Sequence, residues 1–210
     1  MPDSLVDTSC RVFSEQLASP APVPGGGGAA ALIGSLAASL GSMAASLTMG
    51  KKKFLTYEND HRRMIDETQS LRIRFLALID ADAAAFEPLS RVYSMDKNTP
   101  EYAKLLRTAT LAACKAPFEM MQCCSTLITL LEELREKCSV LLLSDVGCAA
   151  VASRAALEAA SMNVFVNTRM LPDDSEAAAI ATEADAILQR DIPRAQALAD
   201  SVSIYLRAKK

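Results

Sequence analysis

Residues 29–49 read AAALIGSLAASLGSMAASLTM, and no charged residue occurs between Glu15 and Lys51. Alanine is the strongest helix former, and small side chains let neighbouring helices approach closely. Gly50 follows directly, as glycine often does at the end of a helix. The stretch therefore predicts a long, buried helix from about Ala29 that ends at Gly50.

The same stretch is long enough to span a membrane, and Lys51–Lys53 would then form a positive flank. Its large apolar side chains are few, however, and Ala, Gly and Ser gain little from contact with lipid. We therefore favour a helix buried in a soluble bundle and no membrane partner. A transmembrane helix hairpin is the alternative.

The composition of the chain predicts an all-α protein. Of its 210 residues 36 are alanine, only 5% are aromatic, and tryptophan is absent. This usage favours helices over strands. The formal net charge of −3 lacks the basic surplus with which nucleic-acid-binding proteins meet phosphates. We therefore expect no nucleic-acid partner.

The N-terminus and the cysteines predict a cytoplasmic protein. Residues 1–10 show neither the basic start nor the apolar core of a signal peptide. The six cysteines form no C-x-x-C pair, which is typical of free thiols that pack as small core residues in a reducing compartment. His61 is the only histidine, so we expect no metal site and interpret His61 as a solvated helix residue.

Apolar periodicity and helix-breaking residues predict five further helices. Their expected ranges are 4–18, 57–93, 101–138, 146–169 and 176–208, with kinks at Pro88, Pro117 and Pro193. The chain shows no strand-like alternation and no linker long enough to divide it. We therefore predict a single domain over residues 1–210, an all-α bundle of long, partly kinked helices.

The turn Pro24-Gly25-Gly26-Gly27-Gly28 opens the central helix. Glycines let a ligand approach the backbone, and the free N–H groups of a helix N-terminus suit a carboxylate, a phosphate or a polar ring edge. The spacing fits neither a Walker loop nor a dinucleotide fingerprint. A plain turn is the alternative interpretation.

One stripe of the predicted helix 57–93 carries a single carboxylate among apolar side chains. At about 100° per residue, its members are Phe75, Ile79, Asp82 and Phe86. An unpaired buried carboxylate is costly, so Asp82 should line a pocket with a raised pKa, form a buried ion pair, or cap another helix. Asp80 points away from this stripe, and we expect it to be a solvated surface residue.

Further polar candidates lie on the helix predicted over 146–169 and beyond Gly50. Asn163 and Asn167 share a stripe of small residues, where they would face a ligand or form hydrogen bonds between helices. Ser144 and Asp145 offer N-cap oxygens to the same helix. The run Lys51–Lys53 is either a solvated charge cluster or a docking point for an acidic ligand tail.

Taken together and in this order, these motifs resemble the cyclodeaminase/cyclohydrolase family of folate enzymes. That family includes the C-terminal domain of formiminotransferase-cyclodeaminase and stand-alone methenyltetrahydrofolate cyclohydrolases. The matching segments are Pro24-Gly25-Gly26-Gly27, Gly50-Lys51-Lys52-Lys53-Phe54, Asp80-Ala81-Asp82-Ala83 with Phe86, Lys97-Asn98-Thr99-Pro100-Glu101, Ser144-Asp145-Val146, and Asn163-Val164 with Asn167. One position departs: Gly28 stands where the family commonly has serine.

The resemblance implies an all-α homodimer that acts on a tetrahydrofolate derivative, with no metal and no prosthetic group. A separate formiminotransferase is a candidate partner. Asp82 would be the acid–base residue, and the amides of Gly25–Gly28 beside Pro24 would hold the pterin or its linker. Lys51 or Lys52 would meet the glutamate tail. Asp145 with Asn163 would orient the ring system. A helical dimer that binds folate without catalysis, or that is purely structural, is the alternative.

Overall fold

The computed structural model describes residues 4–208, and every regular element in that range is helical. In chain order the elements are η1 (Leu5–Asp7), α1 (Cys10–Leu17), α2 (Gly26–Thr48), η2 (Lys52–Tyr57), α3 (Glu58–Tyr93), α4 (Tyr102–Lys137), η3 (Val140–Leu142), α5 (Leu143–Thr168) and α6 (Ser175–Arg207). The predicted all-α class is confirmed.

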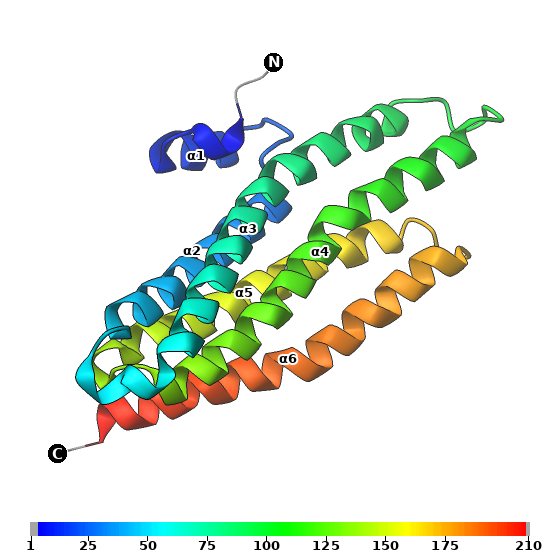
Figure 1. Cartoon of the computed structure of the whole chain (residues 1–210). Helices are drawn as coiled ribbons and strands as arrows, with labels where there is room; N and C mark the ends of the chain where they lie inside the picture. The colour runs from blue at the N-terminus through cyan, green and yellow to red at the C-terminus, as the bar shows by residue number, and fades with distance from the viewer. Residues whose placement is uncertain (1–3, 209–210) are drawn as a thin grey trace.

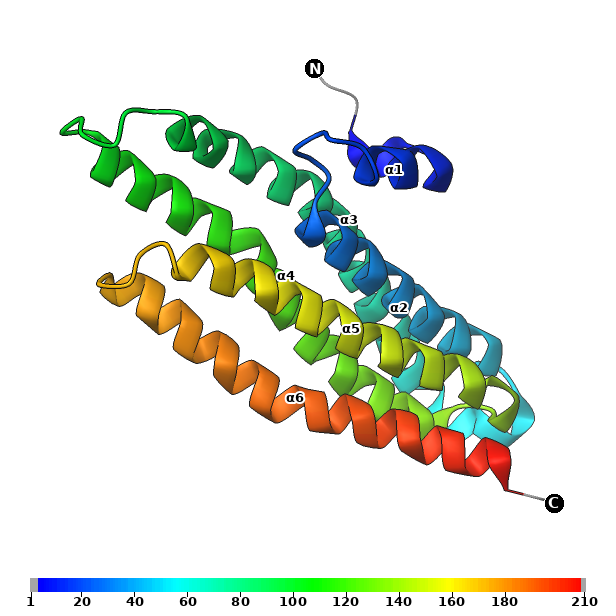
Figure 2. The same ribbon diagram turned by 180° about the vertical axis from the view of Figure 1, so that it is seen from behind.

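The helices α3 to α6 run up and down as two long antiparallel hairpins, and α2 completes the bundle (Figures 1 and 2). Helix α2 packs between α3 and α5, α4 packs on α3 and α5, and α6 lies against α5 and α4. Since α2 has 23 residues and α3 has 36, α2 begins part-way along α3. That starting point turns out to be the candidate site.

The small residues of α2 allow its close approach to α3 and α5. Ten of its alanines and glycines are buried, six of the alanines at or below 1% exposure, and Gly34 faces the ring of Phe75. A Cβ atom at Gly34 would lie 2.6 Å from that fully buried ring. Gly50 ends the segment with φ +76°, a left-handed conformation that favours glycine. The predicted buried helix and its stop are confirmed.

Three predicted boundaries need correction. The helix expected over 4–18 is divided into η1 and α1, because the Ser9 side chain accepts the Val12 N–H and starts a new helix. Helix α2 begins at Gly26 rather than Ala29, so the glycine turn forms its first turn. Helix α5 begins at Leu143, which places Ser144 and Asp145 inside the helix, where neither side chain caps it.

The remaining boundaries agree closely with the sequence-based ranges. Helix α4 begins at Tyr102, just after the predicted start at Glu101. Helix α6 begins at Ser175, where Asp174 accepts the backbone N–H groups of Glu176 and Ala177. The three prolines expected to bend the helices lie inside α3, α4 and α6, and each helix continues past its proline.

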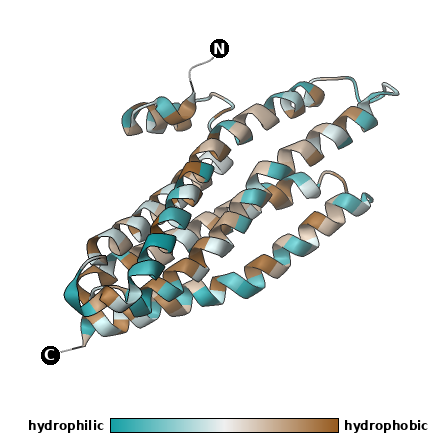
Figure 3. Ribbon diagram, in the orientation of Figure 1, coloured by the Kyte–Doolittle hydropathy of each residue, from teal (hydrophilic) through white to brown (hydrophobic). Residues whose placement is uncertain are grey.

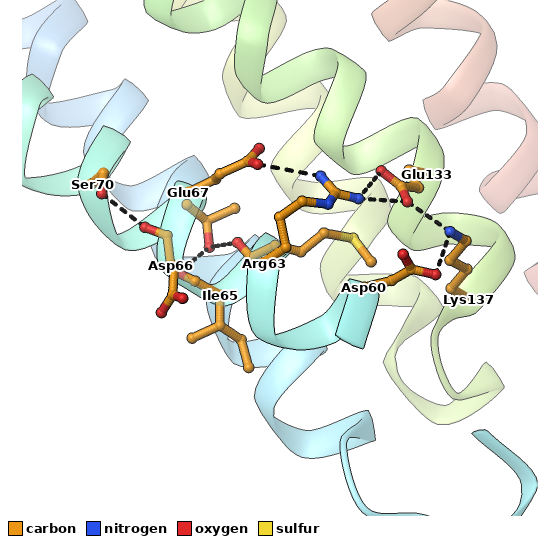
Figure 4. Close-up of polar contacts among 10 residues, drawn as sticks. Asp60, Arg63, Ile65, Asp66, Glu67, Ser70, Glu133 and Lys137 are labelled. Carbon is orange, nitrogen blue, oxygen red and sulfur yellow. Dashed lines mark hydrogen bonds and ion pairs between the residues drawn. The ribbon is translucent and has the colours of Figure 1, made fainter. Parts of the chain in front are cut away.

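The first half of α3 carries much of the hydrophilic surface of the bundle (Figure 3). Lys137 at the end of α4 binds Asp60 and Glu133 through its Nζ atom, at 2.6 and 2.7 Å, and Arg63 lies 2.6 Å from Glu133 (Figure 4). Exposed pairs of this kind add little stability singly. They join the start of α3 to the end of α4.

His61 is fully buried, so its interpretation as a solvated residue is wrong. Its Nε2 atom lies 2.8 Å from the Lys137 carbonyl oxygen, to which it donates a hydrogen bond at the end of α4. The charged neighbours Asp60 and Arg62 point outward, which hid this inward direction in the sequence.

Four of the six free cysteines are buried, as expected for small core residues, whereas Cys10 and Cys148 are exposed.

Two segments, Gly26–Thr48 and Val140–Thr168, are long and apolar enough to cross a membrane by length and composition. Half of each is buried inside the bundle. Core helices of soluble proteins pass the same test, so these segments are weak evidence for a membrane span.

We expect Gly34→Ala to lower the free energy of unfolding by about 1–3 kcal/mol, because the new methyl group overlaps the Phe75 ring. The overlap outweighs the gain of about 1 kcal/mol in helix propensity. Chemical denaturation measures the change. Ser46→Ala, at an exposed position of the same helix, is the matched control and should change stability little. Equal stability of Gly34→Ala and the wild type would contradict this packing.

Candidate active site

The first turn of α2 meets the middle of α3 and the second half of α5 around a small pocket. The pocket has a volume of about 190 Å³. Its lining residues are Pro22, Val23, Gly25, Gly26, Gly27, Asp82, Phe86, Ala113, Asn163, Val166 and Asn167. A larger apolar groove of about 510 Å³ between α5 and α6 has no carboxylate in its lining. The smaller pocket is therefore the candidate active site.

Asp82 lies at the centre of this arrangement, directly over Gly27. Its two carboxylate oxygens occupy the space that a Cβ atom at Gly27 would fill. The backbone N–H of Gly28 favours the ionised form of the same carboxylate. Asp82 thus lies against the first turn of α2 and lines a pocket, which is the first of the three alternatives predicted for it.

Burial raises the pKa of Asp82 to about 6, and the Gly28 amide pulls this pKa partly back. The side chain is half-buried, with the apolar stripe of Phe75 and Ile79 fully buried below it. Among the residues that the structure describes, no charged side chain contributes to the shift. Desolvation is therefore its cause.

The glycines of the turn have different surroundings. Gly26 is exposed and faces the Asn163 amide, at 3.4 Å from a Cβ built on it. Gly28 is buried against Pro24, and a Cβ there would lie 3.3 Å from the Pro24 Cβ atom. The hydrogens on the first amides of a helix have no intrahelical acceptor. The turn therefore presents backbone donors beside the Asp82 carboxylate.

The two asparagines of α5 reach the pocket in different ways. Asn163 donates through Nδ2 to the Ala159 carbonyl oxygen of its own helix at 2.9 Å. Its amide also faces Gly26 across the pocket. Asn167 donates to the Ala113 carbonyl oxygen of α4 at 3.1 Å, so the alternative of an interhelical hydrogen bond is confirmed for Asn167.

Three predicted site residues lie elsewhere. Lys51 and Lys52 are exposed beyond the C-terminal end of α2, and Asp145 lies in the first turn of the antiparallel helix α5. With 23 residues, α2 separates its two ends by about 35 Å at 1.5 Å per residue. The structure therefore brings together Pro24, the glycine turn, Asp82 and Asn163, but not these three residues of the same chain.

Other lining residues were absent from the predicted site. Val23 and Pro22 belong to the proline-rich run before the glycines, where proline is typical of the end of the preceding helix and does not indicate a site. Ala113 and Val166 are small or aliphatic residues on helices, and no sequence pattern distinguishes them from ordinary packing positions.

Asp80 is the remaining correction. It was expected to be a solvated residue, but it is half-buried and accepts two hydrogen bonds from the N-terminal segment.

Over residues 4–208 the structure holds no group of three or more His, Cys, Asp or Glu side chains that suits a metal ion. The chemistry that the pocket offers is proton transfer by one carboxyl group beside a row of backbone amides.

Comparison with known proteins gives concordant results. A sequence model of the formiminotransferase-cyclodeaminase family matches residues 9–186. A methenyltetrahydrofolate cyclohydrolase of Methylorubrum extorquens is 36% identical over 167 residues, which cover 78% of this chain and 80% of that protein. The formimidoyltransferase-cyclodeaminase of Mus musculus is 33% identical over 81% of this chain, and the match spans 32% of the mouse protein.

The fold has a solved counterpart as well. The crystal structure of formiminotetrahydrofolate cyclodeaminase from Thermotoga maritima superposes with a TM-score of 0.83 and covers 94% of this chain and 98% of the other, at 24% identity. At that identity the likeness concerns the fold. With the family match over most of the chain and the cyclohydrolase relative above 30% identity, the chain belongs to the formiminotransferase-cyclodeaminase family.

Proposed function

We propose that this protein is an enzyme of folate one-carbon metabolism, a 5,10-methenyltetrahydrofolate cyclohydrolase, a 5-formiminotetrahydrofolate cyclodeaminase, or both. One observation carries the proposal: a half-buried carboxyl group, Asp82, with a pKa near 6 lies in a pocket beside free backbone amides. A carboxyl group with that pKa is suited to acid–base catalysis near neutral pH. The names of the relatives supply the substrate class.

In cyclodeamination, N10 of 5-formiminotetrahydrofolate attacks the formimino carbon and forms the second C–N bond of the new ring. Asp82 as carboxylate accepts the proton that N10 loses. The formimino nitrogen enters the reaction protonated, so attack leaves it as an NH2 group. As carboxylic acid, Asp82 returns the N10 proton to this group, the C–N bond to it breaks, ammonia leaves, and the positive charge stays on the 5,10-methenyl product. Such proton transfers contribute about 10²–10⁴-fold in rate.

In cyclohydrolysis, water attacks the cationic 5,10-methenyl carbon. Asp82 accepts a proton from the water as the C–O bond forms, and gives a proton to N5 as the C–N5 bond breaks. The product is 10-formyltetrahydrofolate, and one proton is released overall. In both reactions the ionised form of Asp82 also stabilises the positive charge on the carbon and its two nitrogens.

The glycine turn would hold the pterin or its linker through the backbone amides of Gly25–Gly28, with Pro24 supporting the turn and Asn163 orienting the ring. At about 190 Å³ the pocket is smaller than the range of about 300–1,000 Å³ for drug-sized ligands. One part of the folate would lie in it, and the remainder would extend over the exposed Val166. No prosthetic group takes part.

The roles of Lys51 or Lys52 at the glutamate tail and of Asp145 at the ring stay predictions. Because these residues lie about 35 Å from the pocket of their own chain, such roles would require a second chain. A homodimer is in keeping with the exposed apolar faces of α2 and α5, which carry Leu36, Leu47, Val151, Met162 and Val166. The homodimer, a separate formiminotransferase and a cytoplasmic location stay predictions too.

We expect Asp82→Asn to lower the turnover of both substrates by about 10²–10⁴-fold, because the amide neither accepts nor returns a proton. The assay follows the loss of the near-ultraviolet absorbance of 5,10-methenyltetrahydrofolate, with ammonia release measured in parallel on the formimino substrate. Asp66→Asn, at an exposed position of the same helix, is the control and should retain wild-type rates.

Wild-type rates in Asp82→Asn would rule out the acid–base assignment. Binding of a folate by the wild-type protein without turnover of either substrate would favour the non-catalytic alternative.

Asp82→Asn should also change how stability depends on pH. Because the pKa of Asp82 is raised in the folded state, to about 6 from 3.8, the folded protein binds the proton more tightly and loses stability as pH rises from 4 to 6. Relative to Asp82→Asn, the wild type should lose about 1–2 kcal/mol across this window, allowing for its partial exposure. Urea denaturation at several pH values measures the difference, and parallel curves would contradict it.

Gly27→Ala should displace the Asp82 carboxylate, since the methyl group would occupy its position. We expect a loss of about 100-fold in turnover and of about 1–3 kcal/mol in stability. Gly26→Ala is the matched variant, because its methyl group would lie 3.4 Å from the Asn163 amide in ordinary contact. It should retain activity within about tenfold. Similar losses in both variants would contradict this placement of Asp82.

A further inference from the structure

The N-terminal segment formed by η1 and α1 lies on the outside of the bundle, beside the first turn of α2 and the middle of α3 (Figures 1 and 2). Phe13 is the buried residue of α1, at 6% exposure, and it joins the main core. Its ring lies 3.9 Å from the position of a Cβ atom at Gly28. Phe13 therefore covers the glycine whose N–H favours the ionised form of Asp82.

Asp80 holds this segment on α3. The Ser4 hydroxyl donates to Asp80 Oδ2 at 2.5 Å, and the Leu5 N–H donates to Oδ1 at 2.9 Å. Both carboxylate oxygens are thus engaged by the start of η1. Leu5 and the next residue, Val6, pack partly buried against the core beside it. Over residues 4–208, these two hydrogen bonds are the ones that join the N-terminal segment to the bundle.

Asp80 and Asp82 are separated by two positions, so they point about 200° apart around α3. One side of the helix therefore holds the N-terminal segment, while the other places the carboxyl group in the pocket. Both sides meet again at the first turn of α2, because Phe13 faces Gly28 and the Asp82 carboxylate lies over the adjacent Gly27. The two carboxylates are linked through that turn.

We propose that Asp80 is a positioning residue, which fixes the N-terminal segment so that Phe13 seals the glycine turn and keeps water away from the Asp82 carboxyl group. Its effect on catalysis rests on the proposed function, whereas its effect on the hydration of Asp82 does not. Without this attachment, Phe13 would leave Gly28 and water would reach the turn from behind.

The surroundings of Asp82 make it a sensitive reporter of such a change. Helix α2 contributes only uncharged residues, α5 presents the amides of Asn163 and Asn167, and α4 presents Ala113. Phe13 is the nearest side chain of the N-terminal segment to the turn. No titratable group on these packing elements lines the pocket with Asp82. A change in its titration therefore reports a change in hydration.

The test compares Asp80→Ala with the wild type. In protein labelled with ¹³C at the aspartate carboxyl carbons, with Asp82→Asn used to assign the signal, we expect the titration midpoint of Asp82 to fall by about one pH unit. The turnover number should fall by about 10–100-fold, and the acidic limb of its pH profile should move in the same direction. Asp80→Asn keeps one acceptor for the Leu5 N–H. Its Asp82 titration midpoint and its turnover number should therefore lie close to the wild-type values.

Two further variants make the outcome decisive. Phe13→Leu leaves Asp80 unchanged and should also lower the titration midpoint of Asp82. This variant tests the proposal even if Asp80→Ala fails to fold. Asp66→Ala makes the same change at an exposed position of α3. It should leave the Asp82 titration midpoint and the turnover number unchanged. Thermal melting of each variant measures the general loss of stability.

The proposal is overturned if Asp80→Ala and Phe13→Leu leave the Asp82 midpoint at its wild-type value. It is also overturned if turnover falls only in proportion to the fraction of protein unfolded, with an unchanged pH profile. If the wild type converts neither folate substrate, the proposed function fails, and the carboxyl titration alone then decides the role of Asp80.

Discussion

The Asp82 carboxylate occupies the space that the absent side chain of Gly27 leaves open, and the candidate site depends on this contact. Any side chain at Gly27 would separate α3 from the first turn of α2. The carboxylate would then lose the Gly28 amide, and the pocket between the two helices would change shape. A single missing Cβ atom therefore sets both the position of the Asp82 carboxyl group and its degree of burial.

The same reduction of side-chain volume recurs along α2 and makes the bundle possible. Gly34 admits the Phe75 ring, and Gly147 on α5 admits Val202 of α6 in the same way. Asp82 comes from α3 and Asn163 from α5, and the two meet at one pocket only because both helices lie close to α2. The low side-chain volume that predicts a helical bundle from sequence is thus also what assembles the site.

The sequence predicted the parts of this structure that depend on local periodicity. The stripe around Asp82 was identified because helical spacing fixes which side chains share a face. Asp80 and His61 were misjudged for the complementary reason: periodicity says nothing of which other segment covers a face, and the N-terminal segment and the end of α4 cover these two. Only the tertiary arrangement reveals such partners.

The placement of Lys51, Lys52 and Asp145 shows a different limit. They belong to motifs that resemble those of the family, but membership in a motif does not establish proximity. Helix length was available from the sequence, and about 1.5 Å per residue over α2 places its two ends far apart. The antiparallel course of α5 then puts Asp145 at the distant end and Asn163 at the pocket. Motif order alone could not make that distinction.

Two opposing effects determine what Asp82 can do. The N-terminus of a helix and a backbone N–H both favour a carboxylate and lower its pKa, whereas removal from water disfavours it and prevails here. A carboxyl group at a solvated helix end would be ionised throughout the physiological range and could only accept a proton. One buried without any donor would stay protonated and could only give one. With a pKa near 6, Asp82 populates both forms near neutrality, as a reaction that removes one proton and delivers another requires.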